Sequence, residues 1–288
     1  MADTVEKADI RTLDIDKLVK GFALTEYVFK NLVSVSTTNG DSIRWYQETA
    51  ADLTATAPSV VANIAPLAQF TNLEASWTRN TSYPRKYGVE GFISMEDLRT
   101  TDIDVQARTV LRLTRAVVKQ VDTRIYNVLT ESQSPSNIGT AGAVGTGWDD
   151  TSNGNPVIDI LSGQQAISES DYQPIGGVIA MDPKNHKDLL NYLITVKGSS
   201  IPSYSVEKIK SGVVMNLLGM RVVVSNNVVA DSVFVGVPDR AVTWKTAVGT
   251  TARTIEDPGL GVKIRVWEDG EAILTDPAAS YLITDTNT

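Results

Sequence analysis

The 288-residue chain contains no cysteine and only one histidine, His186. The absence of cysteine excludes disulfide frameworks, thiolate zinc sites and cysteine nucleophiles, and a single histidine excludes a histidine-based metal cluster. His186 lies between Lys184 and Lys187 in a predicted helix. We therefore expect it to be solvated rather than catalytic.

Positive charge and long hydrophobic runs are also scarce. The 26 Lys and Arg residues against 34 Asp and Glu residues give a formal net charge of -8. This excludes the broad basic surface of a specific DNA-binding protein. No apolar run approaches the roughly 20 residues that span a bilayer, and the polar, acidic N-terminus is unlike a secretory signal. We expect a soluble, unexported chain without membrane contact, whose 42% hydrophobic composition supports a sizeable core.

One long helix with an irregular first turn is predicted over residues 94–131. Apolar side chains recur there at offsets of three and four, which places them on one face; they are Ile103, Ala107, Val110, Leu111, Val117, Val118, Val121, Ile125, Val128 and Leu129. Basic side chains step along the opposite face; they are Arg108, Arg112, Arg115 and Lys119. An ordinary core helix with a solvated basic face would show the same pattern.

The N-terminal segment, residues 1–37, is predicted to be an amphipathic arm. Its apolar positions have helical spacing; they are Leu18, Phe22, Phe29, Leu32 and Val33. Periodicity alone does not distinguish packing on the chain's own core from packing on a neighbouring subunit. We single out Phe22 and Phe29 as candidate interface residues.

Residues 38–93 predict a long β-hairpin. Ile43 and Trp45 alternate with polar neighbours in one strand, and Leu73, Ala75 and Trp77 alternate in its partner. The connection between the two strands is too long for a compact turn and too apolar for disorder. Contiguous exposed apolar surface usually marks an interaction site. The candidate interface residues at this loop tip are Val60, Val61, Ile64, Leu67 and Phe70.

The rest of the chain predicts an α+β fold. After a loop rich in Gly, Ser and Thr, residues 149–228 alternate short strands and helices, with Asn155–Pro156 and Asp182–Pro183 as helix starts and a turn at Gly219. The last sixty residues return to strands, in which Val262, Ile264 and Val266 alternate with basic residues. These strands need a covering layer, and the long helix is the expected one.

No catalytic, cofactor-binding or metal-binding residue is predicted. The glycine-rich stretch at residues 139–150 lacks the Lys and hydroxyl residue of a phosphate-binding loop. Asp149, Asn153 and Gly154 match a calcium loop only in part. Glu268, Asp269 and Glu271 are interpreted as solvent-facing charges on a hairpin turn at Asp269-Gly270.

The order of these parts resembles the major capsid protein of tailed bacteriophages, the Hong Kong 97 fold. The resemblance covers nearly the whole chain and rests on loose patterns: residues 75–98, IDV at 103–105, VDTRI at 121–125, and the strands at 230–244 and 265–277. It implies an N-terminal arm (1–37), an extended loop (38–93), a peripheral domain with a spine helix and loop (94–148) and later strands (229–273), an axial domain (149–228), and a segment returning toward the axial domain (274–288).

The resemblance also implies function. Similar subunits form pentamers and hexamers of an icosahedral viral shell, with the extended loop lying over the adjacent subunit. The expected partners are other copies of the chain, with portal, scaffolding and decoration proteins as further candidates and non-specific contact with packaged double-stranded DNA. The expected location is the virion, after assembly in the host cytoplasm. The basic side chains listed above become the basic face of the spine helix.

Two departures from the family pattern are visible. Residues before the hairpin leave no room for an N-terminal scaffolding extension within this chain. Some family members crosslink an extended-loop lysine to an asparagine, but no lysine occurs from Asp41 to Arg85. We therefore predict a shell without such covalent crosslinks.

Three alternatives remain open from the sequence. An encapsulin-like compartment would share the fold but enclose protein cargo. A hydrolase or binding enzyme would use the loop at residues 139–154 together with Glu268 and Glu271. A secreted surface or adhesion protein is disfavoured because no signal is seen.

Overall fold

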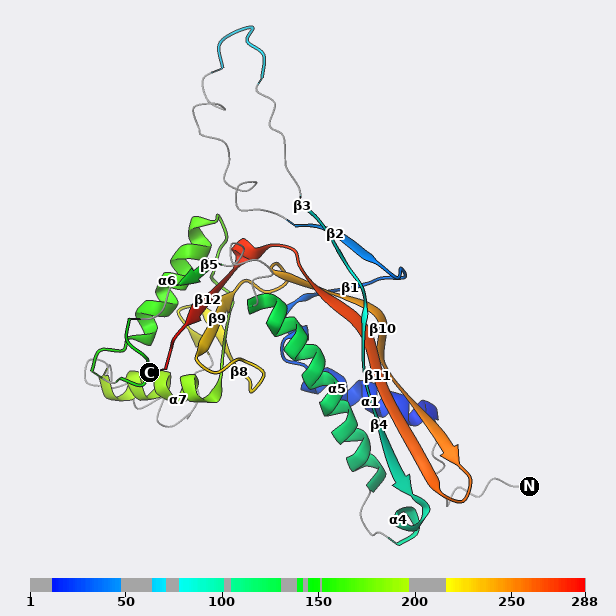
Figure 1. Cartoon of the computed structure of the whole chain (residues 1–288). Coiled ribbons are helices and arrows are strands. Elements are labelled where there is room, and N and C mark those ends of the chain that lie inside the picture. Colours follow the sequence, from blue (N-terminus) through cyan, green and yellow to red (C-terminus); the bar gives the residue numbers. More distant parts are fainter. Residues whose placement is uncertain are drawn as a thin grey trace.

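The computed structural model describes residues 12–47, 64–70, 78–100, 105–130, 139–141, 145–150, 152–196 and 216–287. It contains two sheets of different shape (Figure 1). A long, narrow sheet lies beside one long helix, and a more compact sheet lies against two shorter helices. The described part of the chain is thus of the α+β class.

The long sheet has the strand order β1-β10-β11-β4. β1 (Ser34–Thr37) runs parallel to β10 (Val242–Asp257), whereas β11 (Gly261–Leu274) runs antiparallel to both β10 and β4 (Arg85–Ser94). β10 and β11 form a hairpin closed at Gly259, whose φ of 80° suits glycine. The sheet therefore joins segments from both halves of the chain.

The helix α5 (Val105–Thr130) covers one face of this sheet, and α4 (Met95–Thr100) precedes it. The predicted apolar stripe of α5 is confirmed from Val110 to Leu129. These side chains pack in one core with Val262, Ile264 and Val266 of β11. Gly91 permits the close approach of β4, since an added Cβ would lie 2.9 Å from a Leu113 methyl carbon. The long helix is thus the layer that these strands require.

The compact sheet has the order β5-β12-β9-β6-β8-β7. Its strands are β5 (Gly139–Ala141), β6 (Val178–Met181), β7 (Asn216–Leu217), β8 (Met220–Val224), β9 (Ser232–Gly236) and β12 (Ser280–Thr284). β9 lies in its centre, between β12 and β6. The strand at 232–236 therefore belongs to this sheet and not to the long one, which corrects the boundary expected at residue 229. β12 joins the C-terminal segment to this sheet.

Helix capping in this second unit follows the sequence. Asn155 caps α6 (Pro156–Glu169), and the Asp182 carboxylate accepts a hydrogen bond of 2.9 Å from the Asn185 amide at the start of α7 (Pro183–Asn191). A π-helical turn (Tyr192–Val196) follows α7, and a short 3-10 helix (Pro277–Ala279) precedes β12. The turn at Gly219, with φ of 78°, joins β7 and β8.

The N-terminal segment comprises α1 (Thr12–Glu26) and the 3-10 helix η1 (Lys30–Leu32). The buried stripe of α1 is Ile15, Val19 and Ala23, whereas the predicted Leu18 is exposed. The buried face is offset because α1 lies between α5 and the strand β10 and packs against both. The arm is thus docked on the chain's own body along residues 15–33.

The hairpin stem consists of β2 (Ile43–Gln47) and β3 (Thr78–Ser82), paired antiparallel with Ile43 opposite Ser82. The first strand was predicted correctly. The partner segment predicted at residues 73–95 contains both β3 and β4, and its alternating part at residues 73–77 lies outside the described part of the chain.

Candidate assembly surfaces

The segment 64–70, part of the predicted loop tip, presents its apolar side chains to solvent. Ile64 is 39% exposed, Leu67 fully exposed and Phe70 81% exposed. A backbone hydrogen bond of 3.0 Å from Ala68 to Ala65 closes a turn, in which Leu67 takes a positive φ of 69°. Figure 1 shows the segment well away from both sheets. Val60 and Val61 lie outside the described residues.

The hairpin stem attaches this segment to the body through few contacts. Ile43 is buried, and the Trp45 indole nitrogen donates a hydrogen bond of 3.1 Å to the Leu274 carbonyl. Tyr46 and Tyr83 remain more than half exposed. A two-stranded ribbon is only marginally stable in water on its own. The stem and the segment 64–70 thus form a projecting, incompletely covered surface.

The face of the long sheet opposite α5 is hollowed and predominantly basic. A shallow depression of about 980 Å³ is lined by residues of β4, β10 and β11; they include Lys86, Glu90, Arg253, Ile255, Arg265 and Trp267. Glu90 forms an ion pair of 2.6 Å with Arg265, and Lys86 lies 4.0 Å from the Asp269 carboxylate, which leaves Arg253 as the lining cation without an ion pair among the described residues. This depression, called the outer hollow below, can accept an acidic and apolar segment.

The two predicted arm residues lie in different environments. Phe29 is 0% exposed and packs with its ring centroid 5.1 Å from that of Tyr126 in α5. Phe22 is partly buried against the same core. Phe29 therefore has no surface to offer a second copy of the chain, and its assignment as an interface residue is corrected to a core residue.

The basic residues of α5 are exposed, as predicted. Arg108, Arg112, Arg115 and Lys119 all lie on the solvent side of the helix. Arg115 forms an ion pair with the N-terminal segment, since two of its guanidinium nitrogens lie 2.8 and 2.9 Å from the Glu26 carboxylate. The others form no ion pair with the described residues.

Two of the three carboxylates interpreted as solvent-facing are instead buried, and the third, Asp269, is partly buried. Glu268 and Glu271 are both 0% exposed, and Asp269-Gly270 lies within the strand β11, not at a turn. The true turn is ten residues earlier, at Gly259, because β11 continues to Leu274 with irregular pairing opposite residues 246–251 of β10. The interpretation as a charged hairpin turn is therefore wrong.

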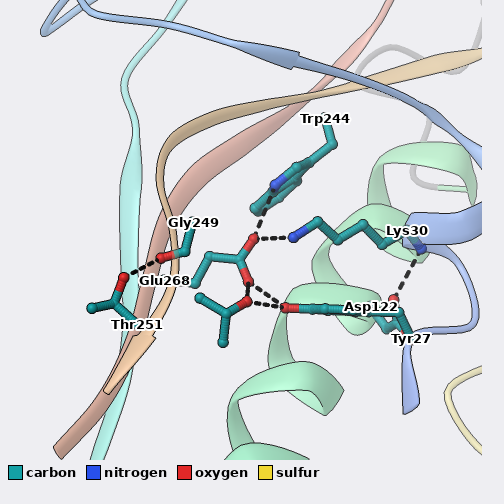
Figure 2. Close-up of polar contacts among 8 residues, drawn as sticks. Tyr27, Lys30, Asp122, Trp244, Gly249, Thr251 and Glu268 are labelled. Atoms are coloured by element: carbon teal, nitrogen blue, oxygen red, sulfur yellow. Dashed lines mark hydrogen bonds and ion pairs between the residues drawn. The ribbon is translucent and has the colours of Figure 1, made fainter. Parts of the chain in front are cut away.

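Glu268 is surrounded by four donors from two segments (Figure 2). The Tyr27 hydroxyl and the Lys30 ammonium donate from the N-terminal segment. Thr250 and the Trp244 indole nitrogen donate from β10 at 2.8 and 3.2 Å. Burial, followed by the charge of Glu268, raises the pKa of Tyr27 far above its ordinary value of 10. Because its oxygens already accept these hydrogen bonds, the Glu268 carboxylate is a structural group rather than a catalytic base.

Asp122 on α5 completes this buried polar cluster. Its carboxylate accepts backbone hydrogen bonds of 2.7 Å from Val28 and 3.1 Å from Lys30. Burial raises the pKa of Asp122 from 3.8 to about 6, and the hydrogen bonds from residues 28–30 oppose that shift. Sequence reasoning missed Tyr27, Lys30 and Asp122 as a group. The one available signal was Asp122 itself, a charged residue directly after Val121 on the apolar face of the helix.

Other candidate sites are not assembled. In the described part of the chain no group of three His, Asp or Glu residues is placed to hold a metal ion. His186 is partly buried, and burial lowers its pKa below 6.5. The Asp150 carboxylate accepts from the Ser152 amide at 2.8 Å and so closes a local turn. Among the described helices none is long and apolar enough to cross a membrane.

The fold is shared with subunits of known particles. The capsid of Cyanophage P-SCSP1u superposes with a TM-score of 0.65 at 13% identity, over 91% of this chain and 89% of that chain. A Mycobacterium phage Che8 structure gives 0.62 at 16% identity, over 91% and 92%. A virus-like particle from Pyrococcus furiosus gives 0.64 at 11% identity, over 94% and 98%. The chain thus has the fold of shell-building subunits, and the predicted Hong Kong 97-like α+β fold is confirmed.

The sequence itself defines the family. The model of the family described as phage capsid protein matches residues 77–283, and the chain belongs to that family. A search of curated protein sequences gave no significant match. The protein is therefore a structural component of a phage capsid rather than an enzyme, and its place is the virion.

Proposed function

We propose that this capsid protein is the major shell subunit of a tailed phage, and that its copies form the pentamers and hexamers of an icosahedral shell around packaged double-stranded DNA. The observation that carries the proposal is the exposed apolar segment 64–70, held on a projecting hairpin. Such surface is costly to leave in water and is covered when a second subunit packs against it.

The surface available to cover this loop is the outer hollow of a neighbouring copy. Residues 48–77 contain Glu48, Asp52 and Glu74 and no Lys or Arg, so this outer part of the extended loop is acidic as well as apolar. The hollow offers Lys86 and Arg253 with the rings and aliphatic side chains of Trp267 and Ile255. Opposite charge favours this pairing and sets its orientation.

The two faces of the long sheet then take different roles. With the extended loop on the sheet side, the basic face of α5 is left for the interior, where Arg108, Arg112 and Lys119 contact DNA phosphates without reading sequence. The long sheet with α5 serves as the peripheral domain, and the compact sheet as the axial domain. Portal, scaffolding and decoration proteins are further proposed partners, with assembly in the host cytoplasm.

Electron microscopy of the purified full-length chain tests the proposal. We expect closed shells with five-fold and six-fold clusters, together with a sedimentation coefficient far above that of a 31.1 kDa monomer. A monodisperse monomer at high concentration, with residues 64–70 protected from hydrogen exchange by the chain's own body, would refute it.

A protein-filled compartment is the second candidate, because the Pyrococcus furiosus particle is matched over 98% of its chain. The contents of purified particles separate the two functions. Nuclease-protected, genome-length DNA supports the phage shell, whereas a specific enclosed protein without DNA supports the compartment.

A further inference from the structure

The buried polar cluster connects two parts of the chain that lie far apart in the sequence. The N-terminal segment contributes Tyr27 and Lys30 to Glu268, as described above. The first residue of β4, Arg85, contributes to Glu271, with its Nε atom 3.0 Å from Oε2. Arg85 follows the hairpin stem by three residues and is the point where the hairpin enters the long sheet. The N-terminal segment and the base of the hairpin therefore both contact β11, the first at Glu268 and the second at Glu271.

The helix α5 closes the connection between these ends. Arg124 donates to Glu271 Oε1 through Nε and approaches the same oxygen through Nη2, both at 2.7 Å. Asp122, two residues earlier, holds the backbone amides of Val28 and Lys30. A continuous path thus runs from Arg85 through Glu271, Arg124 and α5 to the N-terminal segment.

Movement at either end of this path would remove a partner from a buried charge. The cluster contains three carboxylates, on Asp122, Glu268 and Glu271, and three cations, on Lys30, Arg85 and Arg124. Both glutamates are 0% exposed, so each depends on its protein partners for compensation. Removing one partner of a buried ion pair leaves an uncompensated charge and is strongly destabilising.

Arg85 is the most easily displaced member of the cluster. Its side chain is 61% exposed, against 18% for Arg124, and Glu271 Oε2 receives no well-aligned hydrogen bond from the described residues. A displaced hairpin would withdraw Arg85 first and leave Arg124 to neutralise Glu271 alone. Arg124, already 2.7 Å from Oε1, would then have to turn toward Oε2 as well, and the turn of α5 that also bears Asp122 would move with it.

We propose that this cluster is a conformational relay, through which the position of the extended hairpin controls how firmly the N-terminal segment is docked. The relay belongs to the single chain and does not depend on the proposed shell. The position of the hairpin then affects docking of the arm, and docking of the arm affects the hairpin by the same free energy, since a coupling free energy acts equally in both directions. A partner that moves the hairpin would thereby loosen or tighten residues 27–33.

Amide hydrogen exchange of the full-length chain tests the relay. In Arg85→Met, the amides of Val28 and Lys30 should exchange on the order of fivefold faster, although Arg85 contacts neither residue. The matched control is Lys263→Met, which breaks a partly exposed ion pair with Asp257 on the same sheet, away from the residues that line the outer hollow. This control should leave both amides unchanged.

The reciprocal variant Lys30→Met should speed exchange at the start of β4, around Arg85 and Tyr87. Equal rates for Val28 and Lys30 in Arg85→Met and Lys263→Met would overturn the relay. So would an increase in Arg85→Met that extends equally to β6 and α7 in the other sheet, because the change would then be a general loss of stability.

Discussion

The Tyr27 hydroxyl donates a hydrogen bond to the buried Glu268 carboxylate, across 241 positions of sequence. Through this contact the N-terminal segment is held by the β10–β11 hairpin. Because Glu268 is fully buried, the bond also contributes to keeping a carboxylate charge acceptable inside the protein.

Tyr27→Phe removes this donor and keeps the ring. We expect a loss of about 1–3 kcal/mol in the free energy of unfolding, since a buried charged acceptor loses a partner. Urea unfolding followed by circular dichroism measures the change. Tyr83→Phe, at a largely exposed tyrosine, is the control and should remain within about 0.5 kcal/mol of the parent chain. Equal stabilities of the two variants would contradict the role of Tyr27.

The raised pKa of Asp122 predicts a specific pH dependence of the free energy of unfolding. Its pKa is raised from 3.8 to about 6 in the folded chain, so the folded state binds its proton more tightly than the unfolded state. The Asp122 contribution to stability is therefore fully present below about pH 4 and is lost as the pH rises through about 6. The loss is on the order of 1–3 kcal/mol.

Comparing the parent chain with Asp122→Asn isolates this contribution, because the other titrating groups are common to both. Between pH 4 and pH 7.5 the parent chain should lose more unfolding free energy than the variant. Parallel pH profiles would show that Asp122 is not responsible.

Leu67→Asp tests the exposed loop segment. Placing a charge in an interface without a partner is costly, so we expect a folded subunit or capsomer that forms no shells. Leu67→Met keeps an apolar side chain of similar size and should assemble normally. The same loss is expected for aspartate at Val60, Val61 and Ile64 together. Sedimentation and electron microscopy provide the readout, and normal shells from Leu67→Asp would remove this segment from the interface.

The basic face of α5 predicts a salt-dependent contact with DNA. Arg112→Gln with Lys119→Gln should weaken retention of DNA by the subunit and reduce the slope of log affinity against log salt by roughly 2. Arg253→Gln in the outer hollow is the control on the opposite face. Equal losses of DNA retention in the double variant and in Arg253→Gln would indicate that neither face is oriented toward DNA.

The absence of lysine from Asp41 to Arg85 predicts a shell without extended-loop crosslinks. Purified particles boiled in detergent should migrate as a single band of 31.1 kDa in gel electrophoresis. A ladder of covalent oligomers would contradict this expectation.

Local signals in the sequence were sufficient for much of this fold. Asn155–Pro156 and Asp182–Pro183 marked helix starts because a capping side chain acts on amides only two or three residues away. The stripe from Val110 to Leu129 identified the central helix because only one face of it could be apolar. Residues 64–70 proved exposed, as the excess of apolar residues in a long connection suggested.

The buried polar cluster could not be found in the same way. Glu268 and Glu271 flank an Asp-Gly pair, the usual sign of an exposed turn, and only distant residues make them internal. Tyr27 and Lys30 lie more than two hundred positions from Glu268, beyond the reach of any periodic pattern. The central place of β9 in the compact sheet was missed for the same reason, since pairing with β6 and β12 is set by the tertiary fold.

The position of β12 has a consequence for biosynthesis. This strand separates β5 from β9, although it is formed by residues 280–284. During translation residues 280–284 must therefore leave the ribosome before that sheet is complete, and until then the edge of β9 lacks its partner. A growing chain thus cannot form the finished sheet before β12 emerges, which delays premature association on the polysome.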